Sequence, residues 1–213
     1  MRLARADLPG GTLEVLSRGG WANPDVLLVR VGRQRVVVKD FAPRSAWVRV
    51  LLGRWLCRRE LRAYRALQGI AAVPRCLGSL DALALVFEYR PGTPLSRAIP
   101  PGFLDELRRA VAAMHARGVV HLDLRHYSNI LTGEDGHPVV LDFSSALCFE
   151  RWGAIGRRLL PCLAWIDRLA LRKWEARLGP ARPAGQPSPE VEPLSEGSRG
   201  APSAGSRGAS RPM

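Results

Sequence analysis

Hydrophobic and polar positions are arranged in short, strand-like segments over the first forty residues. Residues 12–16, 25–31 and 34–40 are each rich in Val, Leu or both, and Gly32-Arg33 separates the last two. Such segments predict β-strands, and a two-residue connection that contains Gly predicts a tight hairpin. Residues 83–88 form a further apolar run that ends at Arg90-Pro91-Gly92, which predicts a buried strand followed by a turn.

The pattern then changes to a helical period. Residues 45–68 combine spaced aromatic and aliphatic side chains with many arginines, and residues 102–117 carry two acidic residues, Asp105 and Glu106, in the expected first turn, as the helix dipole favours. Three short strands are expected after them, with an Asp-Gly turn between the last two: 119–121, 130–132 and 138–143. This order of elements predicts an α+β fold.

Residues 151–178 carry apolar residues at mostly helical spacing among arginines, and Pro161 predicts a break or a helix start there. One interpretation is an interfacial helix that lies on an anionic membrane with its tryptophans at headgroup level. The other is a helix whose apolar face closes a small core. We favour the second, because so short a C-terminal half needs every apolar residue. The arginine-rich region 42–62 allows the same two interpretations.

Composition limits the remaining possibilities. Residues 179–213 are rich in Pro, Gly, Ser, Ala and Arg without a hydrophobic period, which predicts a disordered tail. The chain has no run of eighteen apolar residues and no apolar signal core near its start, so we expect a cytoplasmic protein without a membrane-spanning helix. The four cysteines are scattered, which favours reduced thiols over a zinc site.

The net charge of +13 alone says little about partners. Of the 32 basic residues only Lys39 and Lys173 are lysine, a bias that looks like a habit of composition. Nucleic acid, an anionic membrane surface and phosphate-rich substrates all fit such a charge. A nucleic-acid binder ranks last, since the chain has no aromatic stacking motif or known module of that kind.

Residues 114–124, Met-His-Ala-Arg-Gly-Val-Val-His-Leu-Asp-Leu, resemble the helix end and catalytic loop of protein kinases. Asn129 with the two residues after it resembles the metal-binding Asn and its strand. Asp142-Phe143-Ser144, 13 residues on, resembles the Asp-Phe-Gly signature with Ser in place of Gly. The resemblance implies a two-lobed protein kinase-like fold, with an N-lobe at 1–90, a reduced C-lobe at 91–178 and the tail at 179–213.

The resemblance also implies the roles of these residues. Phosphoryl transfer depends on positioning and charge neutralisation, so a carboxylate beside the acceptor hydroxyl should orient it and take its proton, and Asp123 is that carboxylate. Asn129 and Asp142 would hold Mg²⁺, which prefers hard oxygen ligands. The step from Asp123 to Asn129 is six residues where the kinase pattern has five. Ser128 is therefore an alternative for part of the place of Asn129.

In the first half, residues 36–39 resemble the Val-Ala-Ile-Lys strand of protein kinases. By this resemblance Lys39 contacts the phosphates of ATP, and Glu60 in the following helix pairs with it. The strand at 85–92 resembles the hinge between the lobes, so backbone groups of Glu88 and Arg90 would bind the adenine edge.

Two elements depart from ordinary protein kinases. The glycine-rich phosphate loop is absent, and residues 17–23, with Gly19-Gly20, stand in its place either as a phosphate loop or as a plain turn. No Ala-Pro-Glu follows Asp142, and the short remaining chain resembles RIO-type kinases and bacterial lipopolysaccharide (Kdo or heptose) kinases.

The expected function is transfer of phosphate from ATP, with Mg²⁺, to a hydroxyl acceptor, first of all a protein Ser or Thr. The alternatives are a lipopolysaccharide-sugar kinase that works peripherally at the inner membrane surface and a nucleotide-binding pseudokinase scaffold. The altered glycine loop and the longer catalytic loop favour the scaffold. The presence of Lys39, Asp123 and Asp142 together favours the enzyme.

Overall fold

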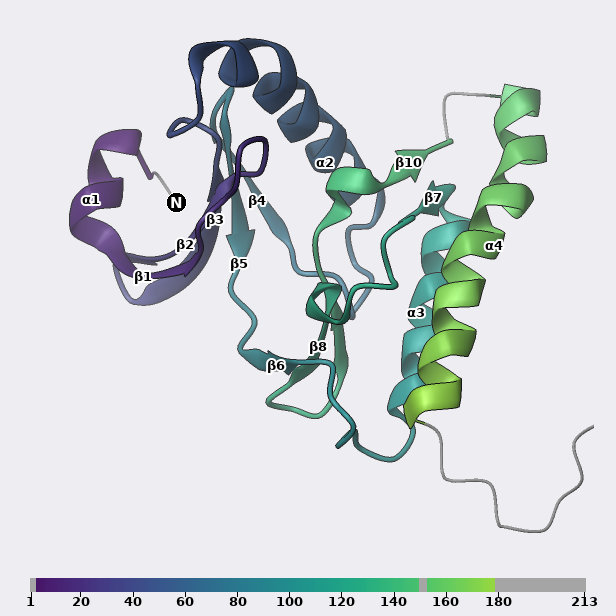
Figure 1. Cartoon of the computed structure of the whole chain (residues 1–213). Helices are drawn as coiled ribbons and strands as arrows, with labels where there is room; N and C mark the ends of the chain where they lie inside the picture. Colours follow the sequence, from purple (N-terminus) through teal and green to yellow (C-terminus); the bar gives the residue numbers. More distant parts are fainter. Residues whose placement is uncertain (1–2, 150–152, 179–213) are drawn as a thin grey trace, which may run out of the picture. The chain divides into compact units, whose positions relative to one another are not determined.

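The computed structural model describes residues 3–149 and 153–178. The described chain is a mixed α+β structure whose sheets are antiparallel, as the sequence predicts (Figure 1). The chain divides into two units after Gly179. The predicted tail at 179–213 lies outside the described residues.

A five-stranded antiparallel sheet forms the N-terminal part, in the order β1-β2-β3-β5-β4. Its strands are β1 (Thr12–Ser17), β2 (Asp25–Val31), β3 (Gln34–Asp40), β4 (Cys76–Asp81) and β5 (Ala84–Glu88). The two-residue hairpin is confirmed, because Val31 pairs with Gln34 and Gly32 has a φ of +59°.

The edge strand β4 is absent from the sequence prediction. Its pairing with β5 is irregular at two places, and Gly78 within it has a φ of +131°. Glycine and a broken register both weaken the period of two on which strand prediction depends. A short N-terminal turn, η1 (Arg5–Asp7), and α1 (Leu8–Gly11) precede the sheet.

The helix predicted at 45–68 consists of two segments with different geometry. A π-helical segment, η2 (Val48–Gly53), leads into the α-helix α2 (Arg54–Ala66). The buried side of α2 carries Cys57, Glu60, Ala63 and Tyr64, so one carboxylate faces the protein interior.

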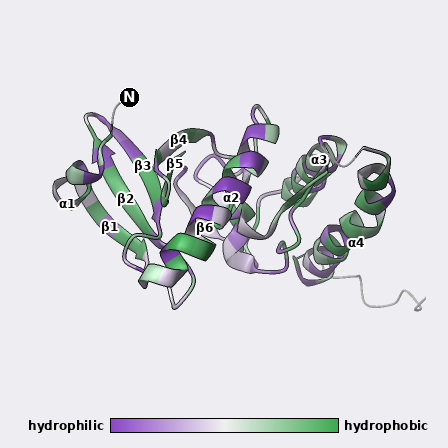
Figure 2. Cartoon of the chain, turned by 90° about the horizontal axis from the view of Figure 1, so that it is seen from above, coloured by the Kyte–Doolittle hydropathy of each residue, from purple (hydrophilic) through white to green (hydrophobic). Residues whose placement is uncertain are grey.

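Two helices and two small sheets form the rest of the described chain. The helices α3 (Phe103–Ala116) and α4 (Gly153–Leu178) lie side by side, and both views show this (Figures 1 and 2). One sheet has β8 (Ile130–Gly133) between β6 (Gly92–Pro94) and β9 (Pro138–Val140), and the other pairs β7 (Val119–Val120) with β10 (Leu147–Cys148). Two single turns complete this part: η3 (Tyr127–Asn129) and η4 (Phe143–Ser145).

Two details of the prediction are wrong. The strand expected at 138–143 ends at Val140, because Asp142 adopts a left-handed conformation and Phe143 begins a 3₁₀ turn. Pro161 neither breaks nor starts a helix and lies inside α4. Proline removes one hydrogen bond from the helix, and here its ring lies on the solvent-exposed side.

The preferred interpretation of the last helix is confirmed in its packing. Ala170, Leu171 and Trp174 of α4 belong to the largest buried cluster, which also includes Phe103 and Leu107 of α3. None of the helices in the described part of the chain is both long and apolar enough to cross a bilayer.

Candidate functional site

Three segments that lie far apart in the sequence bring charged side chains together around Lys39. The Nζ atom of Lys39, on the central strand β3, is 2.7 Å from Oε1 of Glu60 on α2. The same Nζ atom is 2.9 Å from Oδ1 of Asp142, which follows β9. The pairing of Lys39 with Glu60 that the sequence predicts is present, and Asp142 shares the same ammonium.

Burial and charge act in opposite directions on these groups. Burial by itself would lower the pKa of Lys39, but the carboxylates of Glu60 and Asp142 outweigh it and hold this pKa above its usual value. Burial would raise the pKa of Asp142, yet the ammonium of Lys39 and a hydrogen bond from Ser144 hold it below its usual value. Both groups are therefore charged at neutral pH.

The predicted catalytic loop places Asp123 and Asn129 in direct contact. The side-chain amide of Asn129 donates to Oδ2 of Asp123 and to its backbone carbonyl, both at 2.9 Å. The extra residue of this loop is taken up in a turn, in which the amide of His126 donates to the carbonyl of Asp123, followed by the 3₁₀ turn η3. The six-residue step therefore still brings the two side chains together.

A cleft of about 450 Å³ collects most of the predicted site residues. Lys39, Glu88, Arg90, Asn129 and Asp142 line it, and Ser128 lies beside Asn129 in its wall. Glu60 is joined to this cleft through Lys39, and Asp123 is joined to it through Asn129. The remaining wall is largely apolar and includes Val26, Val37, Phe87 and Leu131.

The backbone at two site residues is held in a conformation that only glycine adopts freely. Leu122 has a φ of +69° and Asp142 has a φ of +61°. Such conformations cost about 1–3 kcal/mol each and persist only where the surrounding contacts enforce them. One of these residues precedes Asp123 and the other is itself a candidate ligand, so both strained positions lie at or beside a candidate site residue.

The contact that holds Leu122 is made by Asp167, which sequence reasoning missed. Asp167 of α4 is fully buried, and its carboxylate accepts hydrogen bonds from the backbone amides of His121 (2.8 Å) and Leu122 (2.9 Å). A third partner is Nε2 of His115, at 2.9 Å. The available signal was a lone carboxylate in the apolar segment of 151–174, a position where a buried charge needs partners.

Rings in tilted and edge-to-face contact connect the predicted catalytic loop to the sheet. Phe143 lies 4.7 Å from the ring centroid of His121 and 4.9 Å from that of Tyr64, and Tyr64 lies 4.6 Å from Phe87. His121 is fully buried, and its Nε2 is 2.9 Å from the carbonyl oxygen of Leu141. These contacts hold Leu141, the residue before Asp142, against His121 in the loop that carries Asp123.

The strand end at Glu88 is tied to the preceding loop. The backbone N–H of Glu88 donates to the carbonyl of Arg75 at 2.9 Å, so this donor is used within the protein. The side chain of Arg90 donates to the carbonyl of Ala71 and to the carboxylate of Glu88. The sequence predicts that backbone groups of Glu88 and Arg90 bind the adenine edge. The N–H of Glu88 already donates a hydrogen bond within the protein, to Arg75.

The segment in place of the glycine loop is folded onto its own neighbours. The amide of Gly19 donates to Asp25 at 2.9 Å, and the guanidinium of Arg44 donates to the carbonyls of Gly19 and Gly20. A Cβ at Gly19 would collide with the backbone of Asn23 and Pro24. These contacts favour the plain-turn interpretation for Gly19, whose amide does not face the cleft.

The donor set in the cleft suits a hard cation only in part. Among the described residues there is no cluster of three or more His, Cys, Asp or Glu side chains that could hold a metal ion. Asp142 and Asn129 nevertheless offer a carboxylate and an amide oxygen to the same cleft. Mg²⁺ bound with a nucleotide needs only one or two protein ligands beside phosphate oxygens and water, and these two residues fit that need.

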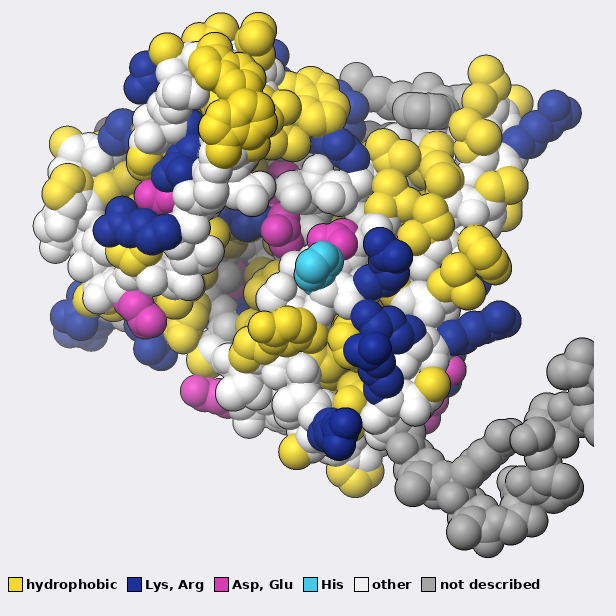
Figure 3. All heavy atoms as spheres, viewed as in Figure 1, with side chains coloured by type: hydrophobic (Ala, Val, Ile, Leu, Met, Phe, Trp, Pro, Cys, Tyr) yellow, Lys and Arg dark blue, Asp and Glu magenta, His cyan; other side chains and the backbone are white. Residues whose placement is uncertain are grey.

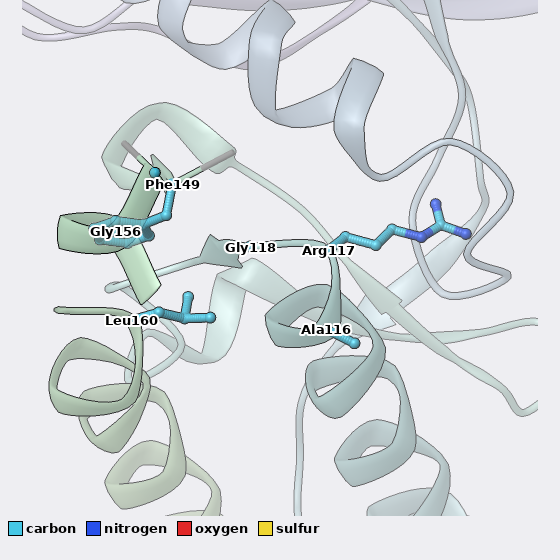
Figure 4. A pocket seen from close by; sticks show the side chains of 7 residues that line it. Ala116, Arg117, Gly118, Phe149, Gly156 and Leu160 are labelled. Carbon is cyan, nitrogen blue, oxygen red and sulfur yellow. The ribbon is translucent and has the colours of Figure 1, made fainter. Parts of the chain in front are cut away.

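A second hollow, of about 340 Å³, lies between the end of α3 and the first turns of α4 (Figure 4). Its lining is mostly small or apolar, with Ala116, Gly118, Gly156 and Leu160 among the residues. Arg117 points away from it and donates to the carbonyls of Ala66 and Gln68. None of the described residues that line this hollow is an acid, a base or a nucleophile, in contrast to the cleft at Lys39.

A scan against protein-family models and a search of curated protein sequences each gave no match.

Proposed function

We propose that the chain has a two-lobed protein kinase-like fold and transfers the γ-phosphate of ATP to a hydroxyl acceptor. One observation carries the proposal, namely that Lys39 contacts both Glu60 and Asp142 in the same cleft that Asn129 lines. The sequence resemblance assigns separate roles to these residues, and their meeting in one place supports those roles. The acceptor classes that we propose are a protein Ser or Thr, or a saccharide hydroxyl.

In this proposal the apolar wall of the cleft holds the base of ATP. The carbonyl of Glu88 and the backbone of Arg90 meet its hydrogen-bonding edge, since the N–H of Glu88 is engaged by Arg75. Lys39 then contacts the phosphates as a compact point charge, and Glu60 keeps it oriented. Asp142 and Asn129 would hold Mg²⁺, which when bound neutralises charge on the phosphates.

Asp123 acts on the acceptor. Its carboxylate orients the acceptor hydroxyl and takes its proton, while the hydroxyl oxygen forms a bond to the γ-phosphorus. The bond from that phosphorus to the bridging oxygen breaks, and ADP leaves with the bond's electron pair. The amide of Asn129, 2.9 Å from Oδ2 of Asp123, holds the carboxylate in place for this step.

The test is transfer of radiolabelled phosphate from ATP with Mg²⁺ by the full chain, offered general protein acceptors and purified lipopolysaccharide. We expect Asp123→Asn to lower transfer by about 10²- to 10⁴-fold, the usual contribution of a general base. Asp142→Asn should lower it as severely. Asp105→Asn, an exposed carboxylate on α3, is the matched control and should leave transfer unchanged. Transfer that persists in both site variants would contradict the proposal.

A nucleotide-binding scaffold is the second candidate, and the engaged amide of Gly19 favours it. A turn that is closed on Asp25 and Arg44 gives the phosphates less cover than a glycine loop would. The same assay separates the two candidates. Wild-type protein that binds ATP but labels no acceptor, and does not label itself, would support the scaffold.

A further inference from the structure

Large apolar side chains are exposed together on the segment from Trp47 through η2 to the first turn of α2 and on the neighbouring turn at 18–24. We call this surface the Trp patch, and Figure 3 shows hydrophobic side chains gathered there, above the sheet, with basic side chains around them. Its five members and their exposed fractions are Trp21 (72%), Trp47 (49%), Val50 (62%), Leu51 (71%) and Trp55 (52%). Soluble proteins expose single apolar residues commonly, but a contiguous group of this size marks an interaction surface.

The Trp patch is a built surface, held together by contacts. The rings of Trp21 and Trp47 lie 4.8 Å apart although they come from different segments. Arg44 fixes the turn that carries Trp21, through the carbonyls of Gly19 and Gly20. Arg59 lies over the ring of Trp55, 5.0 Å from its centroid. The exposed rings therefore have defined positions.

Along residues 42–66, which carry most of the patch, the exposed charge has a single sign. Residues 42–66 contain seven arginines and one acidic residue, Glu60. Glu60 is buried and paired with Lys39, so it contributes no negative charge to the surface. Arg49, Arg54 and Arg58 are all exposed within or beside the patch. A surface of this kind is complementary to an anionic partner with an apolar interior.

We propose that the Trp patch docks on a bilayer that contains anionic phospholipid. Tryptophan rings favour the headgroup level of a membrane, where an apolar body and a polar N–H are both accommodated. Leu51 and Val50, the most exposed aliphatic residues of the patch, enter the acyl boundary, and the arginines meet lipid phosphates. This docking does not depend on phosphotransfer, because binding to vesicles is measured without ATP.

The sequence allowed a membrane-facing surface in either of two regions, 42–62 and 151–178, and the proposal selects the first. The region at 42–62 carries the docking, whereas α4 uses Ala170, Leu171 and Trp174 for the core. The helix α4 does expose Ile155 and Trp165, at 66% and 55%. An aliphatic residue of equal exposure is thus available there as a matched control.

The experiment is co-sedimentation of the full chain with vesicles of phosphatidylcholine alone or of equal parts phosphatidylcholine and phosphatidylglycerol. We expect wild type to bind the anionic vesicles only, with binding that weakens as salt is added. Leu51→Asp should lower the partition coefficient about ten- to a hundredfold, the equivalent of burying one leucine side chain. Ile155→Asp, the control on α4, should bind as wild type does.

A second variant tests the charges apart from the apolar side chains. Arg49→Gln combined with Arg54→Gln should lower binding about fivefold for each arginine removed, by the usual contribution of one basic residue near an anionic surface. Both arginines are exposed, so the variants should keep the wild-type melting temperature, and circular dichroism checks this. Quenching of tryptophan fluorescence by brominated lipid should be strong in wild type and weak in Leu51→Asp.

Three outcomes would overturn the proposal. They are no binding by wild type to anionic vesicles, equal binding to neutral and anionic vesicles, and equal losses in Leu51→Asp and Ile155→Asp. The patch would instead bind a second copy of the chain if three results were found together. The wild type would dimerise without vesicles, the Leu51→Asp variant would be monomeric, and neither would bind vesicles. Failure of vesicle binding leaves the radiolabel result untouched, so the two proposals fail separately.

Discussion

At the scale of single residues, the candidate site depends on one ammonium shared by two carboxylates. A lysine suits this place better than arginine, because a compact ammonium can meet Glu60 and Asp142 at 2.7 and 2.9 Å from a single nitrogen. The sequence bias sharpens the point. Lys39 and Lys173 are the only lysines among 32 basic residues, so the lysine at this position is not explained by composition.

The first prediction concerns His121, which burial keeps neutral. Burial lowers the pKa of His121 in the folded protein, against a smaller opposing effect of the Leu141 carbonyl. In the unfolded chain the same imidazole has its ordinary pKa of about 6.5. Below that pH the unfolded chain takes up a proton that the folded chain does not. The stability contributed by neutral His121 is therefore present above pH 6.5 and lost as the pH falls towards the folded pKa.

We expect the free energy of unfolding to fall by about 1 kcal/mol through this residue between pH 7.5 and pH 5.5. Urea unfolding at the two pH values measures it, and His121→Gln is the control that lacks the titration. The difference in pH dependence between wild type and the variant isolates His121. His137, whose pKa is raised by its contact with Glu106, is unchanged in both proteins. Identical pH dependence in wild type and variant would contradict the prediction.

At the scale of elements, α4 supports the loop that carries Asp123 through two side chains, Asp167 and Trp174. Asp167 is the acceptor for two backbone amides that come directly before Asp123, and Nε1 of Trp174 donates to the carbonyl of Leu124 at 2.8 Å. The last helix thus fixes the loop on both sides of Asp123.

The second prediction is that Asp167→Ala destabilises the protein by about 2–4 kcal/mol, because it leaves buried N–H groups of His121 and Leu122 without an acceptor. Hydrogen exchange at these two amides should accelerate, and phosphate transfer should fall. Glu175→Gln on the same helix is the control, since its exposed ion pair with Arg108 contributes at most about 1 kcal/mol. Slow exchange at both amides in Asp167→Ala would show that the carboxylate does not hold the loop.

Elements also mark the limit of what the sequence could predict. The strands β2 and β3 and the helix α3 have a clean period and standard turns, and their predicted bounds agree with the structure to within about one residue. The π-helical segment before α2 could not be predicted, because six residues are too few for the apolar spacing to distinguish π from α geometry. Pro161 inside α4 misled the prediction, since tertiary packing of the helix outweighed one lost hydrogen bond.

The candidate site likewise has a part that the sequence predicts and a part that it does not. The motif residues were identified from their order and spacing, since local rules fix the strand or loop that carries each one. The engaged N–H of Glu88 and the three partners of Asp167 depend on contacts between segments 13 and more residues apart. No periodic pattern in the sequence encodes such contacts, because they form only when distant segments meet in the folded chain.

At the scale of the whole molecule, the cleft gathers residues from both the sheet and the segments after residue 120. Val26 and Val37 come from the sheet, and Leu131 and Asp142 come from the later part of the chain. A ligand that fills this cleft binds only the folded state, because the unfolded chain does not bring these residues together. Binding must then raise the free energy of unfolding by mass action.

The third prediction is that ATP with Mg²⁺, at about 100 times its dissociation constant, stabilises the full chain by about 2.7 kcal/mol. For a folded part of this size that corresponds to a rise in Tm of about 5–10 °C. ATP with a chelator should give a smaller rise, because Asp142 and Asn129 then meet the phosphates without a cation between them. Thermal unfolding followed by a fluorescent dye measures each shift.

Asp142→Asn separates the contribution of the cation from that of the base and sugar. This variant should keep the smaller rise seen with chelator and lose the additional rise with Mg²⁺, whereas Asp105→Asn should keep both. A rise of equal size in wild type and Asp142→Asn would mean that nucleotide binds without the carboxylate, away from Lys39. The absence of any rise at saturating ATP would remove the nucleotide from the cleft altogether, and with it both the enzyme and the scaffold.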